Sequence, residues 1–155
     1  MEELVKNILR LVDFSNRYIE VCNSYNDFDN GGSFKKQAIT DILRDADSDL
    51  IYSSREKLFY KDYNYEHINL RYILPYKYGF IDCMYAFWNE DNTERVRGSF
   101  GTLSALVDPE FPSKVNHKFP IATCECDLKE IINYLLVLHN DFINKFEEKL
   151  LSNKT

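Results

Sequence analysis

Residues 79–88 read Gly-Phe-Ile-Asp-Cys-Met-Tyr-Ala-Phe-Trp and give the strongest strand pattern in the chain. Alternate residues of a strand point to opposite faces, and here both faces are apolar except at Asp82. One face carries Ile81, Cys83, Tyr85 and Phe87, and the other carries Phe80, Met84, Ala86 and Trp88. Because a strand with two apolar faces is typical of the middle of a sheet, we expect this one to be central and covered on both sides.

The sequence on either side predicts antiparallel partners for this strand. Ile68, Leu70 and Tyr72 alternate with polar residues up to Pro75, and residues 58–62 favour another strand. Residues 89–93 form a polar loop of hairpin length before a return strand at 94–100. Residues 102–107 fit either a strand or a helical turn, residues 108–120 an irregular loop, and residues 121–126 a last strand. The pattern predicts an antiparallel β-meander of about four to five strands.

Helices are predicted at both ends of the chain. Residues 2–25 form one amphipathic pattern, and residues 34–47 form a second with Ser33 as its N-cap. At the other end, Asp127 and Glu130 have the spacing of a capping box. An apolar stripe then runs from Leu128 to Leu150, so we expect a long C-terminal helix packed on the sheet. Residues 1–155 thus read as a single α+β domain.

Composition restricts the class of protein. A chain of 155 residues with 45% apolar content can build one hydrophobic core. The longest aliphatic run, at 135–138, is too short for a membrane span, and the first residues do not resemble a secretory signal. We expect reduced cysteines and a cytoplasmic protein without membrane contact. The abundance of Asn, Lys, Ile and Tyr is typical of AT-rich microbial, including bacterial, genes.

Motifs for catalysis, phosphate binding and metal binding are missing from the sequence. Cys124 and Cys126 could share an ion on one face of a strand, but a second ligand pair at zinc-site spacing is lacking. The histidines at 67, 117 and 139 are scattered, and His139 is expected at the edge of the core with one hydrogen bond. We therefore expect no enzyme, no cofactor and no metal.

Charge and tyrosine content point to a protein partner. The net charge of −6 argues against nucleic-acid binding and suits a basic partner. Eight of the 11 tyrosines lie between residues 52 and 88, and tyrosine is a frequent anchor of protein interfaces. The candidate partner-binding residues are the polar-flanked tyrosines and the acidic residues near them: Tyr63, Tyr65, Tyr76, Tyr78, Asp62, Glu66, Glu90 and Asp91.

These features favour a protein-binding module, most specifically a small acidic inhibitor of the immunity type. Such a protein neutralises a basic toxin or nuclease by occluding it. One alternative is a small-molecule site or undetected enzyme in a pocket between sheet and helices, with polar contributors at His67, Arg71, Asp82, Arg95 and Arg97. Another is a structural or regulatory subunit, which could form a homodimer through the aromatic surface.

Overall fold

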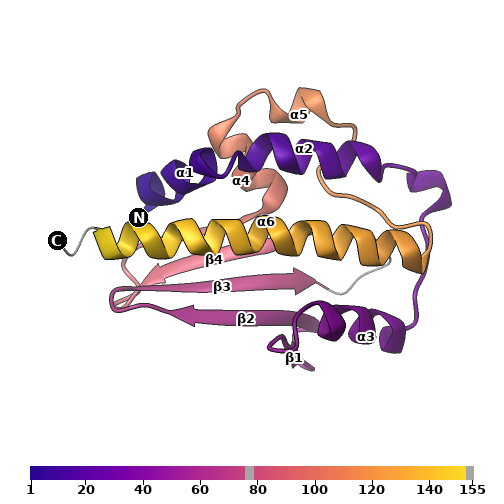
Figure 1. Ribbon diagram of the computed structural model, residues 1–155, viewed down its shortest axis with the longest axis horizontal. Helices are drawn as coiled ribbons and strands as arrows, with labels where there is room; N and C mark the ends of the chain where they lie inside the picture. The colour runs from indigo at the N-terminus through magenta and orange to yellow at the C-terminus, as the bar shows by residue number, and fades with distance from the viewer. Residues whose placement is uncertain (76–78, 153–155) are drawn as a thin grey trace.

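A five-stranded antiparallel sheet with helices packed on it forms the protein, as seen in a computed structural model that describes residues 1–75 and 79–152 (Figure 1). The sheet order follows the chain, β1-β2-β3-β4-β5. Its strands are β1 (Ile51–Ser53), β2 (Leu58–Asn64), β3 (Ile68–Pro75), β4 (Met84–Asn89) and β5 (Arg95–Ser99). The predicted α+β fold with an antiparallel meander is confirmed.

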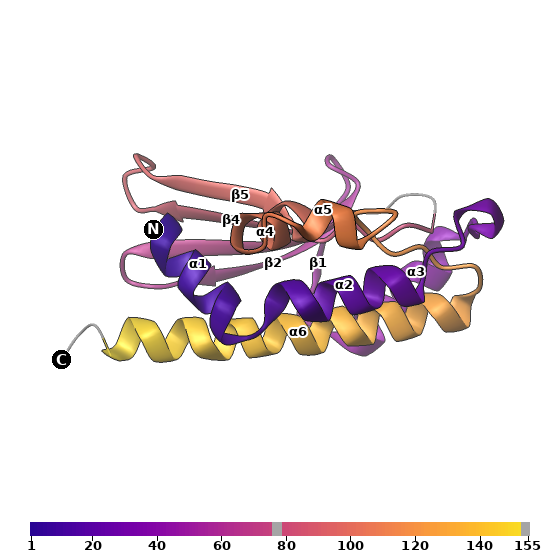
Figure 2. The same ribbon diagram turned by 90° about the horizontal axis from the view of Figure 1, so that it is seen from above.

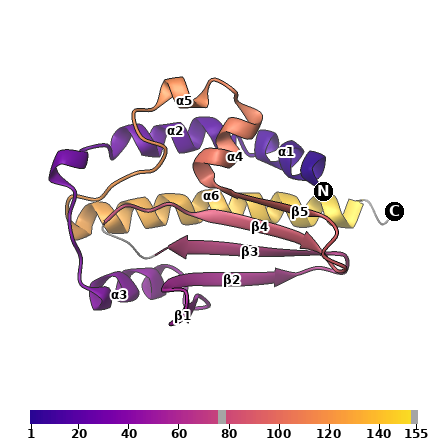
Figure 3. The same cartoon turned by 180° about the vertical axis from the view of Figure 1, so that it is seen from behind.

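Helices cover only one face of this sheet. The long α6 (Glu125–Ser152) runs along the strands, and its Phe142 ring lies 4.8 Å from Tyr85 and 6.0 Å from Phe87 (Figure 1). Seen from behind, the opposite face has no helix across it (Figure 3). The predicted cover on both sides of residues 79–88 is therefore wrong, and the strand begins only at Met84. Met84, Ala86 and Trp88 are shielded only by neighbouring side chains and stay half-buried.

The predicted helix over residues 2–25 is broken at Asp13. It forms α1 (Glu2–Leu11) and α2 (Phe14–Ser24), which continue along the same side of the molecule (Figure 2). Asp13 has a left-handed backbone with φ of 53°, which aspartate tolerates better than most residues. Its carboxylate accepts a 2.8 Å hydrogen bond from the Asn16 amide. The break turns Phe14 into the core, against Phe100.

Three further helices lie before and after the meander in the chain. The predicted helix at 34–47 appears as α3 (Lys36–Ala46), but Ser33 does not cap it, because Lys35 occupies the N-cap. After β5, residues 102–107 resolve as helix in α4 (Phe100–Val107), with Ser99 Oγ accepting a hydrogen bond from the Thr102 amide. The predicted irregular loop at 108–120 contains a short helix, α5 (Phe111–Lys114), anchored by the buried Phe111 ring.

The predicted last strand at 121–126 is not formed. Ile121 makes only an isolated bridge with Phe80, and α6 begins at Glu125. Cys124 Sγ accepts a hydrogen bond from the Asp127 amide, while the Asp127 carboxylate accepts one from the Thr123 amide. This reciprocal capping ends the extended chain, and it leaves Cys124 and Cys126 exposed. The predicted N-cap therefore shifts toward the N-terminus by three residues.

In the part of the chain that the structure describes, ten of the 23 aromatic side chains of the sequence lie in the core. Phe14, Tyr18, Phe59, Tyr72, Tyr85, Phe87, Phe100, Phe111, Phe142 and Phe146 are fully buried. All four cysteines are free, with Cys22 and Cys83 in the core. Across the described residues, no helix combines the length and apolarity needed to cross a membrane.

Candidate functional site

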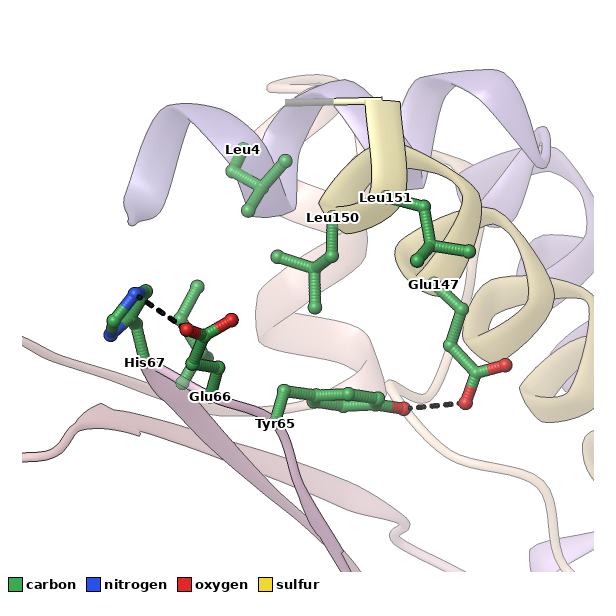
Figure 4. Close-up of a pocket in the computed structure, with 8 residues that line it drawn as sticks. Leu4, Tyr65, Glu66, His67, Glu147, Leu150 and Leu151 are labelled. Carbon is green, nitrogen blue, oxygen red and sulfur yellow. Dashed lines mark hydrogen bonds and ion pairs between the residues drawn. The ribbon is translucent and has the colours of Figure 1, made fainter. Parts of the chain in front are cut away.

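A groove of about 660 Å³ lies where three distant parts of the chain meet (Figure 4). The start of α1, the turn between β2 and β3, and the last turns of α6 form its walls. We call it the terminal groove, and its lining is Leu4, Tyr65, Glu66, His67, Ile68, Glu147, Leu150 and Leu151. It brings together segments separated by more than half of the chain.

The groove is apolar inside. Leu150 points into it toward the Tyr65 ring, with Leu4 on the α1 side (Figure 4). Leu151 is 67% exposed, which is the highest exposure among the large apolar side chains of the described residues. An apolar concave surface open to water is typical of a site that buries a partner's side chains.

Tyr65 joins the turn to the helix and is held in place by its contacts. Its hydroxyl donates a 3.0 Å hydrogen bond to Glu147 Oε1, and its ring packs 5.3 Å from the Phe146 ring. Burial and the Glu147 carboxylate raise the pKa of Tyr65 well above its ordinary value, so the hydroxyl stays protonated. The ring therefore offers a fixed aromatic floor to the groove.

Carboxylates flank the groove on two sides. Glu147 stands beside Tyr65, while Glu66 lies 3.8 Å from the His67 ring on the other side (Figure 4). The Glu66 and His67 side chains are both exposed. Such a rim favours a basic partner.

The turn between β4 and β5 adds acidic residues to the same end of the sheet. The pairing of Ile68 with Asn89 places this turn beside the β2–β3 turn. Glu90 is exposed, and Asp91 accepts hydrogen bonds from the Thr93 backbone and hydroxyl. These bonds lower the pKa of Asp91, which keeps it charged. Four of the predicted binding residues (Tyr65, Glu66, Glu90 and Asp91) thus collect at one end of the molecule.

The other predicted residues lie elsewhere. Asp62 accepts two hydrogen bonds from Arg71, at 2.6 and 2.8 Å, on the helix-free face of the sheet. Tyr63 points under the helices, where its hydroxyl lies 2.8 Å from His139 Nε2. Tyr76 and Tyr78 fall outside the described residues. Asp62 and Tyr63 therefore have structural partners away from the groove.

His139 is the centre of a buried polar cluster that the sequence did not reveal. Instead of one hydrogen bond it has two, from its ring nitrogens to Tyr63 and Tyr85, and it stacks 3.9 Å from Tyr72. Burial lowers the pKa of His139 to about 3, so the ring is neutral at physiological pH. A neutral ring donates through one nitrogen and accepts through the other, which suits two hydroxyls. The cluster fixes α6 on the sheet.

The polar residues of the alternative pocket do not converge between the sheet and the helices. Arg71, Arg95 and Arg97 lie on the helix-free face, since they alternate with the covered positions of their strands. His67 lines the terminal groove, and Asp82 has one buried carboxylate oxygen without a hydrogen-bond partner. Within residues 1–75 and 79–152, no three side chains of His, Cys, Asp or Glu could jointly hold a metal ion.

Sequence patterns missed the groove residues of the two helices. Leu4 and Leu150 belong to apolar stripes that predict core packing, and Glu147 looks like any charged residue of a solvated helix face. These residues form a site only because α1 and α6 both pack beside the β2–β3 turn in the folded protein. A scan of protein-family models, a search of curated proteins and a search of solved structures all give no match to this chain, so its function has to be argued from the site itself.

Proposed function

We propose that the protein is a cytoplasmic protein-binding module, and specifically an immunity-type inhibitor that neutralises a basic toxin or nuclease by occluding it. The terminal groove is the centre of the proposed binding surface, with the β4–β5 turn at its edge. The observation that carries the proposal is the exposed apolar lining around Leu151, which is flanked by carboxylates.

The chemistry of the groove supports a protein as the ligand. Protein interfaces combine a buried apolar or aromatic centre with a polar rim. Here Leu150, Leu151 and the Tyr65 ring supply the centre, while Glu66 and Glu147 supply the rim. A basic partner with an apolar side chain between lysines or arginines would match both parts. The net charge of −6 would speed its approach.

One observation favours a second candidate function. His67 and Glu66 lie 3.8 Å apart in the groove lining, so an acid–base pair adjoins an apolar pocket. This arrangement supports a small-molecule site or an enzyme as the alternative. Both side chains are well exposed, so the pair is not enclosed in a cleft that would hold a substrate away from water. For this reason the inhibitor is preferred.

Co-expression tests the inhibitor. Toxins and their inhibitors are commonly made together, so the gene next to the one for this protein should encode a protein that stops growth when expressed alone. Growth should return when both are made. The variant Leu151→Glu should lose the rescue, and Val137→Glu should retain it. Val137 is the matched control, because it is an exposed apolar residue of α6 that lies outside the groove lining. A harmless neighbour that forms no complex would count against the proposal.

A further inference from the structure

The helix-free face of the sheet carries its own ordered set of side chains, which we call the open sheet face. Cross-strand pairing arranges them in rows. The first row is Asn64, Asn69, Trp88 and Arg95; the second is Asp62, Arg71, Ala86 and Arg97; the third is Tyr60, Ile73, Met84 and Ser99. Trp, Tyr and Arg, the residue types that most often dominate protein interfaces, are all present.

This face carries a net positive charge, in contrast to the whole chain, because Arg71, Arg95 and Arg97 outnumber the carboxylates of Asp62 and Glu56. Asp62 is neutralised by Arg71, whose guanidinium also lies 4.3 Å from the Tyr60 ring centre. Arg95 and Arg97 are exposed, and neither forms an ion pair or side-chain hydrogen bond with any described residue. Two uncompensated arginines next to each other on an edge strand would attract carboxylates. They would also repel the basic partner proposed for the terminal groove.

A hollow of about 300 Å³ lies among these residues. Its apolar surface comes from Leu58, Ile73 and Ala86, and Trp88 and Arg97 stand at its side together with Arg71 and Glu56. The volume suits one large apolar side chain, because a leucine or phenylalanine side chain fits well within it. The neighbouring Arg97 is then within reach of an acidic residue adjoining that side chain.

We propose that the open sheet face is a second docking surface, which takes an acidic segment of a partner protein. The segment places an apolar side chain in the hollow beside Trp88 and a carboxylate on Arg97, with Arg95 extending the positive surface. This inference goes beyond the inhibitor function, since it concerns another face and a partner of opposite charge.

Other occupants fit the face less well. Single-stranded nucleic acid is bound by successive aromatic rings that stack on successive bases. Here the Tyr60 ring is covered by Arg71, and the hollow is floored by aliphatic side chains. A second copy of the chain in a two-fold dimer would place this patch against itself, so Arg95 and Arg97 would face like charges. An acidic protein segment satisfies both the charge and the hollow.

Selection from a displayed library of random heptapeptides tests the proposal without a known partner. Peptides retained by the wild-type protein should include a class with Asp or Glu beside Leu, Phe or Met. Trp88 is the only tryptophan, so binding of a synthesised member of this class should change the intrinsic fluorescence in a saturable way. The variant Arg97→Glu should weaken this binding at least about tenfold. Arg44→Glu, an equal charge change at an exposed position of α3, should leave it within about twofold.

Several results would overturn the inference. One is a selection that yields no peptides with Asp or Glu beside an apolar residue. Another is an affinity of Arg97→Glu for the acidic peptide equal to that of the wild type. A third is saturable binding of an oligothymidine in place of the peptides. A concentration-dependent dimer that Arg97→Glu abolishes would assign the face to a second copy. The two proposals can fail independently, because they concern different peptides and different variants. Basic peptides should bind at the terminal groove, and Leu151→Glu should abolish that binding while Arg97→Glu leaves it unchanged.

Discussion

The Tyr85 hydroxyl lies 2.8 Å from Nδ1 of His139, inside the core and between strand β4 and helix α6. The Tyr63 hydroxyl lies at the same distance from the other ring nitrogen. Both nitrogens of a fully buried imidazole are thereby satisfied, so it can remain neutral without the cost of an unpaired polar group. The helix that bears His139 also forms a wall of the terminal groove, and the cluster therefore helps to position the site.

Acid should destabilise the protein through His139. Its pKa is about 3 in the folded state and near 6.5 in the unfolded chain, so the unfolded state takes up a proton first as the pH falls. The nearby Lys61 lowers this pKa further, whereas Asp47 acts in the opposite sense. The free energy of unfolding should fall by about 2 kcal/mol from this group between pH 7 and pH 5. Urea unfolding of the wild type and His139→Gln across this range checks it, and parallel curves would contradict it.

The two tyrosines of the cluster should contribute unequally. Tyr85→Phe leaves a fully buried ring nitrogen without a partner and should cost about 1–3 kcal/mol of unfolding free energy. Tyr63 is only half-buried, so water can replace its hydroxyl and Tyr63→Phe should cost less. Thermal unfolding of the two single variants and the double variant measures the difference. A larger loss for Tyr63→Phe would refute this description of the cluster.

Gly79 should not tolerate a side chain. Its φ is +78°, and an added Cβ would collide with the Gly32 carbonyl oxygen. We expect Gly79→Ala to lower the free energy of unfolding by about 2 kcal/mol or more, combining backbone strain with that collision. Gly98→Ala is the control, because its nearest neighbours would be side chains rather than backbone, Thr102 at 3.2 Å and Leu103 at 3.5 Å. Equal stability of the two variants would show that the close approach at Gly79 is absent in solution.

The acidic rim should govern how fast a basic partner binds. Charge reversal of both Glu66 and Glu147 to lysine should lower the association rate constant about tenfold at low salt. The effect should shrink as salt screens the charges. The double variant Glu110→Lys and Asp45→Lys makes the same change in net charge beside α5 and on α3, outside the groove lining, and serves as the control for a change of charge alone. Stopped-flow measurements at two salt concentrations give both quantities, and rates independent of salt would exclude electrostatic steering.

Local patterns account for the elements that were predicted correctly. Alternation at residues 68–72 gives β3, and the apolar stripe from Leu128 gives α6, because each signal lies within one element. The break at Asp13 was missed, since the helical periodicity of the apolar residues continues across it. The prediction that Trp88 would be covered by other elements was also wrong, because the burial of that face depends on where distant helices pack.

The sequence predicted only part of the terminal groove, because its residues come from segments that are far apart in the chain. Tyr65 and Glu66 were identified by composition, as a tyrosine beside charges. Glu147, the hydrogen-bond partner of Tyr65, lies 82 residues away from it, and no local pattern connects the two. The role of His139 likewise depends on Tyr63 of β2 and Tyr85 of β4, two strands that lie on either side of β3 and reach the same histidine only in the folded sheet.

The most direct test of the inhibitor proposal is the dissociation constant of the complex with the toxic neighbour, measured by titration calorimetry for wild type, Leu151→Glu and Val137→Glu. A charge placed in the apolar centre of an interface should weaken binding by about 2 kcal/mol or more, which is roughly 30-fold. We therefore predict at least that loss for Leu151→Glu and an unchanged constant for Val137→Glu. Wild-type affinity in Leu151→Glu would contradict the assignment of the terminal groove as the binding site.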